Sequence, residues 1–565
     1  MEKDVEKGDG EVARPRESHL AVHPGNRVSL ARVSIGGPPP PPPPKEDVPR
    51  PMTSSTRRLS FSTTYSERKI KYGTGRHSQT ELSPQPTDDP DDPLNWPQWK
   101  KELNFVALLM TAGLVGGMKT AYISVNSVVA VRFNVSYTAV ASLTAVPLVI
   151  SAFTGLFSVV ASKIWGKRPV YLISMVLIFI GAIANMAAGN NFGGCMAGRV
   201  FQGFGWGAFD TLILGSIQDT YFEHQRNVRI TIYNILTVAT TWGAPLFGGL
   251  ASANAGRFTV QFEIINAFQF IAIPLLLFGA PETAFERWFS SSPAPTPGSV
   301  TSSPWASQPP KPLGRPSVED AKAYLRTMKP VSFSGTMDLR TILQAPRAFV
   351  APTTGLLVVV TFLPYCTLWA FWRRRASDYT PYCIACTLAA GTVLASSGIL
   401  AFGLKTHDVM SEVSASAAAP SNVFATDGVG THLSFPLVSL LLGLLAAGVG
   451  TLDTAIRPVI WRSTQFTSSN MNVCLRNVAD MDAGVVCWRN LLSGVFVMTV
   501  PGAIVMWAGL KATVVGLGVT QVLVGVAGCA LWWIYDERVR RLDGIVMGLV
   551  DLSMLKRTGS FFDTD

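Results

Sequence analysis

The sequence predicts an all-α polytopic membrane protein made of two helical bundles, and three observations lead to this fold class. Charged residues make up only 15% of the 565-residue chain, against about 25% in ordinary soluble proteins. The apolar residues gather in blocks that match the ~20 residues a helix needs to cross a bilayer. A polar stretch near the middle separates six of these blocks from five more.

Each apolar block predicts one membrane helix. The first six form an N-terminal bundle over 103–282, and a cytosolic middle loop follows over 283–346. The other five form a C-terminal bundle over 347–535. In chain order, the eleven blocks are 103–131, 138–162, 169–189, 194–218, 229–252, 262–281, 348–372, 381–403, 434–456, 484–508 and 512–534.

Polar segments flank the two bundles. Residues 1–87 are rich in Pro, Ser and charges of both signs, which predicts a disordered cytosolic tail. Within it, Pro38 to Pro44 favour polyproline II, which polyproline-binding partners recognise, and Ser60 follows two arginines in a pattern that basophilic kinases phosphorylate. An entry segment over 88–102 precedes the first helix, and a cytosolic tail over 536–565 ends the chain.

Lys and Arg residues set the orientation, because they are enriched on the cytosolic side of membrane proteins. A cytosolic N-terminus places most of these residues in inner loops, and the plasma membrane is the expected location. The inner loops then hold Lys163, Lys167, Arg168, Arg226 and Arg229, whereas the outer ones hold little besides Arg132 and Arg257.

Composition argues against three other classes of protein. The net charge is +10, but the basic residues form short clusters between apolar blocks, so no nucleic-acid partner is expected. Cys383 and Cys386 have CxxC spacing without a second pair, so neither a metal site nor a cofactor is predicted. The histidines lack a nucleophile or a paired acid, and the chain is not expected to be an enzyme.

Three ionisable residues lie deep within apolar blocks. Arg199 and Asp210 are eleven residues apart in the fourth block, which places them on one helix face about 16 Å apart. Lys119 lies midway along the first block, and we expect it to contact Asp210. Because a charge inside a membrane is costly, such residues normally face a protein interior or a wet cavity. These three predict a substrate or proton pathway, with a permanent ion pair as the alternative.

Glycine and proline mark places where helices pack or bend. Gly203 and Gly207 have the GxxxG spacing that lets a neighbouring helix come close. Pro245, Gly248 and Gly249 predict a bend in the fifth helix. A second set of charges lies at an inner helix end: Asp453 and Arg457 have the spacing of an i,i+4 ion pair.

Five segments together resemble the major facilitator superfamily, and within it the fungal drug, polyamine and histidinol transporters. They are DDPDDPLNWPQWKKELNF at the entry, GKRPVYL, GRVFQGFGWGAFDTL, DTYFEHQRNVR and PETAF. The resemblance implies that Arg199 and Gly203 belong to a fourth-helix motif that contributes to proton coupling. It also implies that Pro245, Gly248 and Gly249 belong to a fifth-helix motif associated with antiporters.

The sequence departs from the family pattern at three places. Lys163 replaces an acidic residue in the loop after the second helix, and Ala244 replaces a glycine of the fifth-helix motif. Block 348–372 and the arginines Arg373 to Arg375 resemble the family's eighth helix and its following loop, so the seventh helix is missing. In this family the seventh helix is one of four that line the central cavity.

The resemblance implies a secondary active transporter that moves a small organic solute by alternating access, coupled to protons. Asp210 and Lys119 would meet the solute or proton, and Arg199 would set the proton affinity nearby. Import and export both remain open, and so do two alternatives: a non-transporting membrane sensor or scaffold, and a defective transporter that lacks one cavity helix. Gating loops are expected at Gly166, Lys167, Arg168, Asp219 and Arg226.

Overall fold

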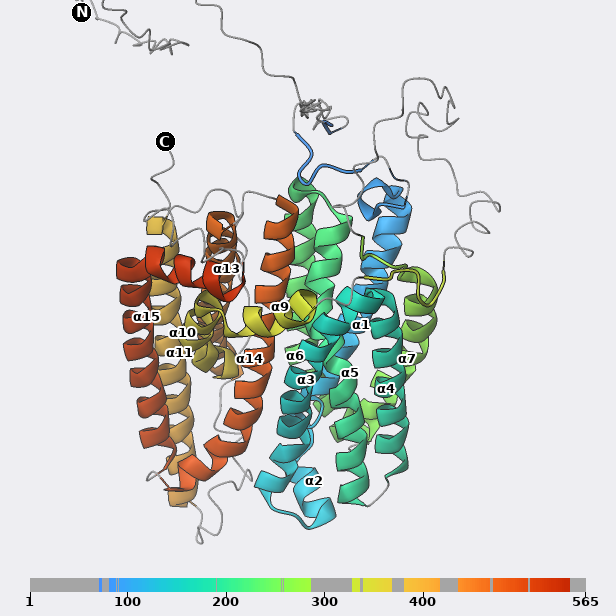
Figure 1. Cartoon of the computed structure of the whole chain (residues 1–565). Coiled ribbons are helices and arrows are strands. Elements are labelled where there is room, and N and C mark those ends of the chain that lie inside the picture. Colours follow the sequence, from blue (N-terminus) through green and yellow to red (C-terminus); the bar gives the residue numbers. More distant parts are fainter. Residues whose placement is uncertain are drawn as a thin grey trace, which may run out of the picture. The chain divides into compact units, whose positions relative to one another are not determined.

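In the part that a computed structural model describes, nearly all of the regular secondary structure is helical (Figure 1). Apart from helices, these residues show one isolated β-bridge, between Tyr72 and Glu81. The expected all-α fold is therefore confirmed. The predicted polyproline run, Ser60 and the cluster Arg373 to Arg375 lie outside the described residues. The described residues are 71–73, 81–87, 89, 91–188, 191–255, 257, 259–285, 328–335, 339–367, 381–416, 435–467, 471–506 and 509–548.

Helices α1 to α7 form what we call the first half. Figure 1 shows α3, α4 and α5 side by side, and α5 packs against both of its neighbours. The bounds are α1 Gln98–Thr120, α2 Asn126–Phe133, α3 Tyr137–Trp165, α4 Lys167–Ala187, α5 Phe192–Thr220, α6 Glu223–Ala255 and α7 Val260–Gly279, with short 3₁₀ helices at Pro93–Asn95 and Ile123–Val125.

Helices α9 to α15 form the second half. Helix α10 packs against α13, α14 and α15, and α11 packs against α13 and α15. The bounds are α9 Leu339–Val350, α10 Pro352–Thr367, α11 Pro381–Ser416, α13 Phe435–Thr467, α14 Met471–Met506 and α15 Leu510–Val546.

Nine of the described helices are long and apolar enough to cross a membrane. The number becomes ten if Ile342–Val350 and Pro352–Phe362, which meet at 49°, form one broken span. Helix α5 is not among the nine although it has 29 residues, because glycines and polar side chains lower its hydropathy. Most of its residues are buried against neighbouring helices, and Phe201 and Phe204 lie on its exposed face. The number of helices in each half stays a prediction.

The first predicted block, 103–131, is broken in the structure. Helix α1 ends at Thr120, a 3₁₀ turn covers Ile123–Val125, and α2 then runs from Asn126 to Phe133. The prediction of one continuous helix was therefore wrong. Its physical reason is that the last carbonyl groups of α1 accept hydrogen bonds from Arg199 of α5, a partner that the local sequence does not reveal.

The glycines of α5 let two helices approach it from different sides. A Cβ atom at Gly203 would lie 2.8 Å from the Pro147 backbone of α3, and one at Gly207 would lie 2.4 Å from the Gly155 nitrogen of the same helix. A Cβ atom at Gly205 would instead meet the α4 backbone, 2.5 Å from the Ser174 oxygen. Gly203 and Gly207 therefore lie at a close helix contact, as their spacing predicts.

Each half has a hydrophobic core, and α14 joins the two. Trp206 and Phe209 belong to the core of the first half, whereas Leu445 and Leu452 belong to that of the second. Helix α14 lies between the halves in Figure 1 and packs against α3 and α5 as well as α10 and α13. A Cβ atom at Gly494 of α14 would lie 2.8 Å from the Ala145 oxygen of α3. The two halves thus meet along a close contact between α3 and α14.

Candidate functional site

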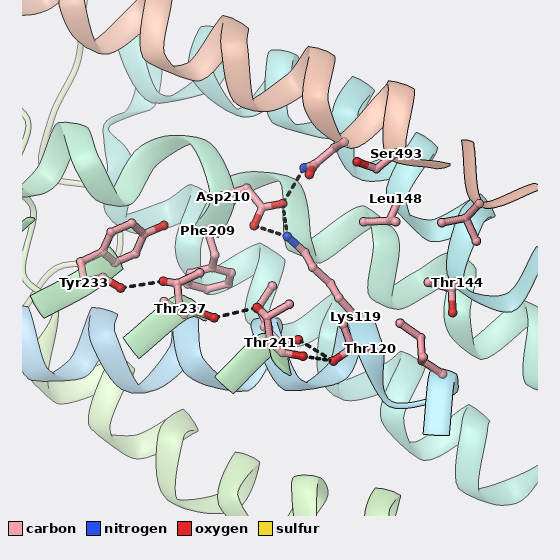
Figure 2. A pocket seen from close by; sticks show the side chains of 16 residues that line it. Lys119, Thr120, Thr144, Leu148, Phe209, Asp210, Tyr233, Thr237, Thr241 and Ser493 are labelled. Atoms are coloured by element: carbon pink, nitrogen blue, oxygen red, sulfur yellow. Dashed lines mark hydrogen bonds and ion pairs between the residues drawn. The ribbon is translucent and has the colours of Figure 1, made fainter. Parts of the chain in front are cut away.

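A cavity of about 110 Å³ lies where the two halves meet. Figure 2 shows side chains that line it. Helices α1, α3, α5 and α6 of the first half and α14 of the second contribute to its wall. An apolar wall with a few convergent polar groups is typical of small-molecule sites. The apolar lining comes from Ala112, Val115, Ile123, Leu148, Phe209 and Val497, and the polar lining from Lys119, Thr120, Thr144, Asp210, Tyr233, Thr237, Thr241, Asn490 and Ser493.

Lys119 and Asp210 form an ion pair in this cavity. The Lys119 ammonium donates to both carboxylate oxygens of Asp210, at 2.6 and 2.7 Å. The two side chains are 13% and 12% exposed, so both remain accessible from the cavity although they are largely buried. The contact that the sequence predicts between the first and fourth blocks is present. Whether it opens during function stays a prediction.

Asn490 connects this pair to the second half. Its Nδ2 atom donates to Oδ2 of Asp210 at 2.8 Å, from α14 to α5 (Figure 2). Sequence reasoning missed Asn490, although it interrupts the apolar block 484–508 together with Arg489. Asp210 therefore receives hydrogen bonds from both halves of the protein.

Arg199 contacts the broken first helix instead of a carboxylate. Its guanidinium donates to the backbone oxygens of Met118 at 2.8 Å and Lys119 at 3.4 Å, and to the backbone oxygen of Leu143 in α3 at 2.9 Å. The side chain is 1% exposed and lies over the rings of Tyr122 and Trp206. A cation at the negative end of a helix is stabilising. Arg199 thus fixes the backbone that carries Lys119, and its expected role in proton affinity stays a prediction.

Threonines of α1 and α6 form a polar wall next to the ion pair. Thr120 donates to the backbone oxygen of Thr241 at 2.6 Å, which joins α1 to α6. Thr241 and Thr237 donate within α6, to Thr237 at 2.7 Å and to Tyr233 at 2.8 Å. Figure 2 shows these bonds along one side of the cavity. The hydroxyl hydrogens are thereby directed to backbone oxygens.

Gly166, Lys167 and Arg168 lie at a sharp turn between α3 and α4. Gly166 has a φ of 90°, which favours glycine. The backbone nitrogens of Lys167 and Arg168 donate to the two carboxylate oxygens of Glu282, each at 2.9 Å. A carboxylate at a helix N-terminus caps it and complements its dipole. Glu282 belongs to the PETAF segment, and its capping role was missed from the sequence.

The other two predicted gating residues lie at the same end of the first half. Lys167 forms an ion pair with Asp219 at 2.7 Å, between the start of α4 and the end of α5. Arg226 donates to the backbone oxygens of Gln218 at 3.1 Å and Tyr221 at 3.2 Å, where α5 gives way to α6. The structure therefore brings these residues together around the ends of α4, α5 and α6, while gating itself stays a prediction.

Lys163 joins the two halves at this same end. Its ammonium lies 2.6 Å from Oδ2 of Asp480 in α14, with side-chain exposures of 11% and 5%. It also donates to Gln344 of α9 at 3.3 Å, and Gln344 donates to Asn477 of α14 at 2.8 Å. The replacement of an acidic residue by Lys163 is thus matched by an acidic partner in the second half, which the sequence reading did not identify.

The predicted ion pair between Asp453 and Arg457 of α13 was wrong. Asp453 instead pairs with Arg489 of α14, and Arg457 lies 3.4 Å from Asp482 of α14. The side chains of Asp482 and Arg489 are each 7% exposed. Pairing between α13 and α14 neutralises these two buried charges. An i,i+4 pair within α13 would leave both of them without a partner of opposite charge.

Helix α6 is one helix across the residues where the sequence predicts a bend. It runs from Glu223 to Ala255 with Pro245 inside it. A Cβ atom at Gly248 would lie 2.7 Å from the side-chain oxygen of Gln261 in α7, so Gly248 permits a close contact with α7, and Gly249 follows it. A bend at these residues stays a prediction. The described residues hold no group of three or more His, Cys, Asp or Glu side chains arranged to bind a metal.

The sequence profile of the Major Facilitator Superfamily matches residues 107–460. An uncharacterized MFS-type transporter of Schizosaccharomyces pombe is similar at 27% identity over 208 residues, 36% of this chain and 35% of that protein. Protein HOL1 of Saccharomyces cerevisiae is similar at 25% identity over 210 residues, again 36% and 35%. The alignments thus span 35% of the length of these relatives.

A solved structure is also similar. The proton:xylose symporter XylE bound to 6-bromo-6-deoxy-D-glucose has a TM-score of 0.42 at 14% identity. The match covers 78% of this chain and 96% of that chain.

Proposed function

The chain belongs to the Major Facilitator Superfamily, and on that premise we propose that it is a secondary active transporter of a small organic solute. The solute is of drug, polyamine or amino-alcohol type, and its movement is coupled to protons by alternating access. We also propose a cytosolic N-terminus, because Lys and Arg gather in the loops that this orientation makes cytosolic. The plasma membrane is the location that we propose.

The observation that carries the proposal is the hydrogen-bonded group of Lys119, Asp210 and Asn490. A carboxylate inside a membrane is costly unless a partner neutralises it, so its retention in a cavity favours a functional role. Asp210 lies on α5 of the first half and accepts from Asn490 of the second half. Binding of a solute or proton at Asp210 thus alters a contact between the halves, which alternating access requires.

Movement of the halves also has to open contacts at the end where α3 meets α4. The ion pair between Lys163 and Asp480 and the hydrogen bond from Lys163 to Gln344 connect α3 of the first half to α14 and α9 of the second. These contacts join the two halves at that end. We propose that they separate when the cavity opens toward it.

A second candidate function is a membrane sensor or a defective carrier that does not transport. The sequence has six apolar blocks before the middle loop and five after it. This observation favours a reduced second half and agrees with a missing seventh helix. The second candidate predicts a membrane-inserted protein without solute flux.

The substitution Asp210→Asn separates the two functions. In transport-deficient yeast that expresses the full chain, we expect proton-dependent uptake or efflux of spermidine, histidinol or a cationic drug. Asp210→Asn abolishes this coupled flux without lowering the amount of membrane-inserted protein. Asp408→Asn, at an exposed aspartate of α11, serves as the matched control and keeps the flux. Unchanged flux in Asp210→Asn would remove that residue from the mechanism, and no flux from the inserted wild-type chain would favour the sensor or defective carrier.

A further inference from the structure

We propose that the Lys119 ammonium is a built-in counter-ion that occupies the cation site of the empty carrier and carries the coupled proton. This inference rests on the proposed transport function and assigns a role to Lys119 within it. An ammonium group of the solute takes the place of Lys119 beside Asp210. Lys119 returns to Asp210 when the solute leaves.

Asp210 is the partner that stays in place. It lies within the 29-residue helix α5, on a short side chain, and Asn490 holds it from α14. Lys119 has a long side chain in the last turn of α1, directly before the break in the first block. Figure 2 shows the Lys119 side chain extended along the cavity to reach the carboxylate. The movable partner is therefore the cation, and the position that it vacates beside a carboxylate is a cation site.

The backbone of Lys119 is fixed while its side chain has room to turn. Arg199 holds the backbone oxygens of Met118 and Lys119, and the adjacent Thr120 bonds to Thr241 of α6. A cavity of about 110 Å³ lies next to the ammonium. Displacement of Lys119 thus needs only a rotation of its side chain.

Charge balance indicates that Lys119 carries the coupled proton. In the empty carrier the pair is neutral. When a solute ammonium binds Asp210, a displaced Lys119 ammonium would be left without a carboxylate against an apolar wall, which is costly. Lys119 therefore releases one proton to the water from which the solute came, and takes one up when the solute leaves on the other side. One organic cation moves in one direction and one proton in the other, and the net charge of the site does not change.

Several polar or ionisable groups surround Lys119. Asp210 and Arg199 face it from α5, and Asn490 reaches the same carboxylate from α14. Tyr233 lines the cavity from α6. Asp210 is the carboxylate in direct contact with the ammonium, so the exchange of its partner decides the charge of the site.

The substitution Lys119→Met tests this role. Without the ammonium, the empty carrier holds an unpaired carboxylate. At pH 9, where a carboxyl group seldom takes up a proton, this charge disfavours the return of the empty carrier by roughly a hundredfold, on the cost of a charge within a membrane. The loaded carrier is unaffected because the solute neutralises Asp210. In proteoliposomes with radiolabelled histidinol or spermidine, we expect Lys119→Met to retain exchange of labelled for unlabelled solute. Its net flux into solute-free vesicles falls about a hundredfold, and a pH-sensitive dye records no accompanying proton movement.

Two controls accompany this measurement. Lys119→Arg keeps a cation beside Asp210 and retains more net flux than Lys119→Met, and Lys511→Met, at an exposed lysine of α15, leaves both fluxes unchanged. If Lys119→Met has the same ratio of net flux to exchange as the wild-type protein, the inference is overturned and the transport function is left intact. Loss of both fluxes in properly inserted Lys119→Met also overturns it, in favour of a permanent ion pair. Absence of flux in the wild-type protein refutes the transport function itself, and the inference with it.

Discussion

Replacing Lys163 by methionine leaves the Asp480 carboxylate without its ion-pair partner, and we expect a large loss of stability. The two side chains are 11% and 5% exposed, and the charged atoms are 2.6 Å apart. Removing one partner of a buried ion pair typically lowers the free energy of unfolding by about 3–5 kcal/mol, because a buried charge is left uncompensated. Replacing both partners by apolar residues is often nearly neutral. The double variant Lys163→Met/Asp480→Leu should therefore regain most of the stability that Lys163→Met loses.

The assay is reversible unfolding of the full chain in detergent micelles titrated with dodecyl sulfate, followed by tryptophan fluorescence. A double-mutant cycle on Lys163 and Asp480 should give a coupling free energy of about 3 kcal/mol. The matched control is the pair Arg541 and Glu537 of α15, with exposures of 48% and 58%. An exposed i,i+4 pair contributes about 0.3–0.5 kcal/mol. Coupling at Lys163 and Asp480 as weak as in this control would refute the reasoning that the pair fastens the two halves.

Two further predictions use the same unfolding assay. Gly207→Ala should destabilise the protein by about 1–3 kcal/mol, because the new methyl group would lie 2.4 Å from the Gly155 nitrogen of α3. Gly516→Ala, where no atom lies within 4 Å, should instead stabilise it by about 0.5–1 kcal/mol, and equal effects at both glycines would contradict the close contact. Glu282→Gln should cost about 1–2 kcal/mol, because the amide loses the charge that caps α4 at Lys167 and Arg168. Glu537→Gln, at an exposed glutamate, is its control, and a similarly small effect at Glu282 would argue against the cap.

Features set by neighbouring residues in the sequence were predictable. Hydrophobic blocks indicated the membrane helices, and glycine spacing indicated the close contact at Gly203 and Gly207. The contact between Lys119 and Asp210 was also predictable, because two deeply placed opposite charges each need a partner. In these cases either periodicity or the cost of a buried charge left few alternatives.

Features that depend on how helices dock were not predictable from one sequence. Arg199, about 80 positions later in the chain, donates to a backbone oxygen at the end of α1. No local signal in the sequence therefore marks the break after this helix. Asn490 reaches Asp210 across a separation of 280 residues, and Asp480 reaches Lys163 across 317. Asp453 had a suitable local partner, but the docking of α13 against α14 gave it Arg489 instead. Docking of distant helices therefore determined the partners of these charges.

Helix α14 imposes a limit on insertions and deletions in this chain. Asp480 and Asn490 reach the first half from one uninterrupted helix, at positions ten residues or about 15 Å apart. Insertion of a single residue between them would turn one contact by about 100° relative to the other. Compensation by a nearby substitution is not available, because every later side chain of the helix turns with it. Length variation among related chains should therefore fall in the loops around α14 and spare the segment from Asp480 to Asn490.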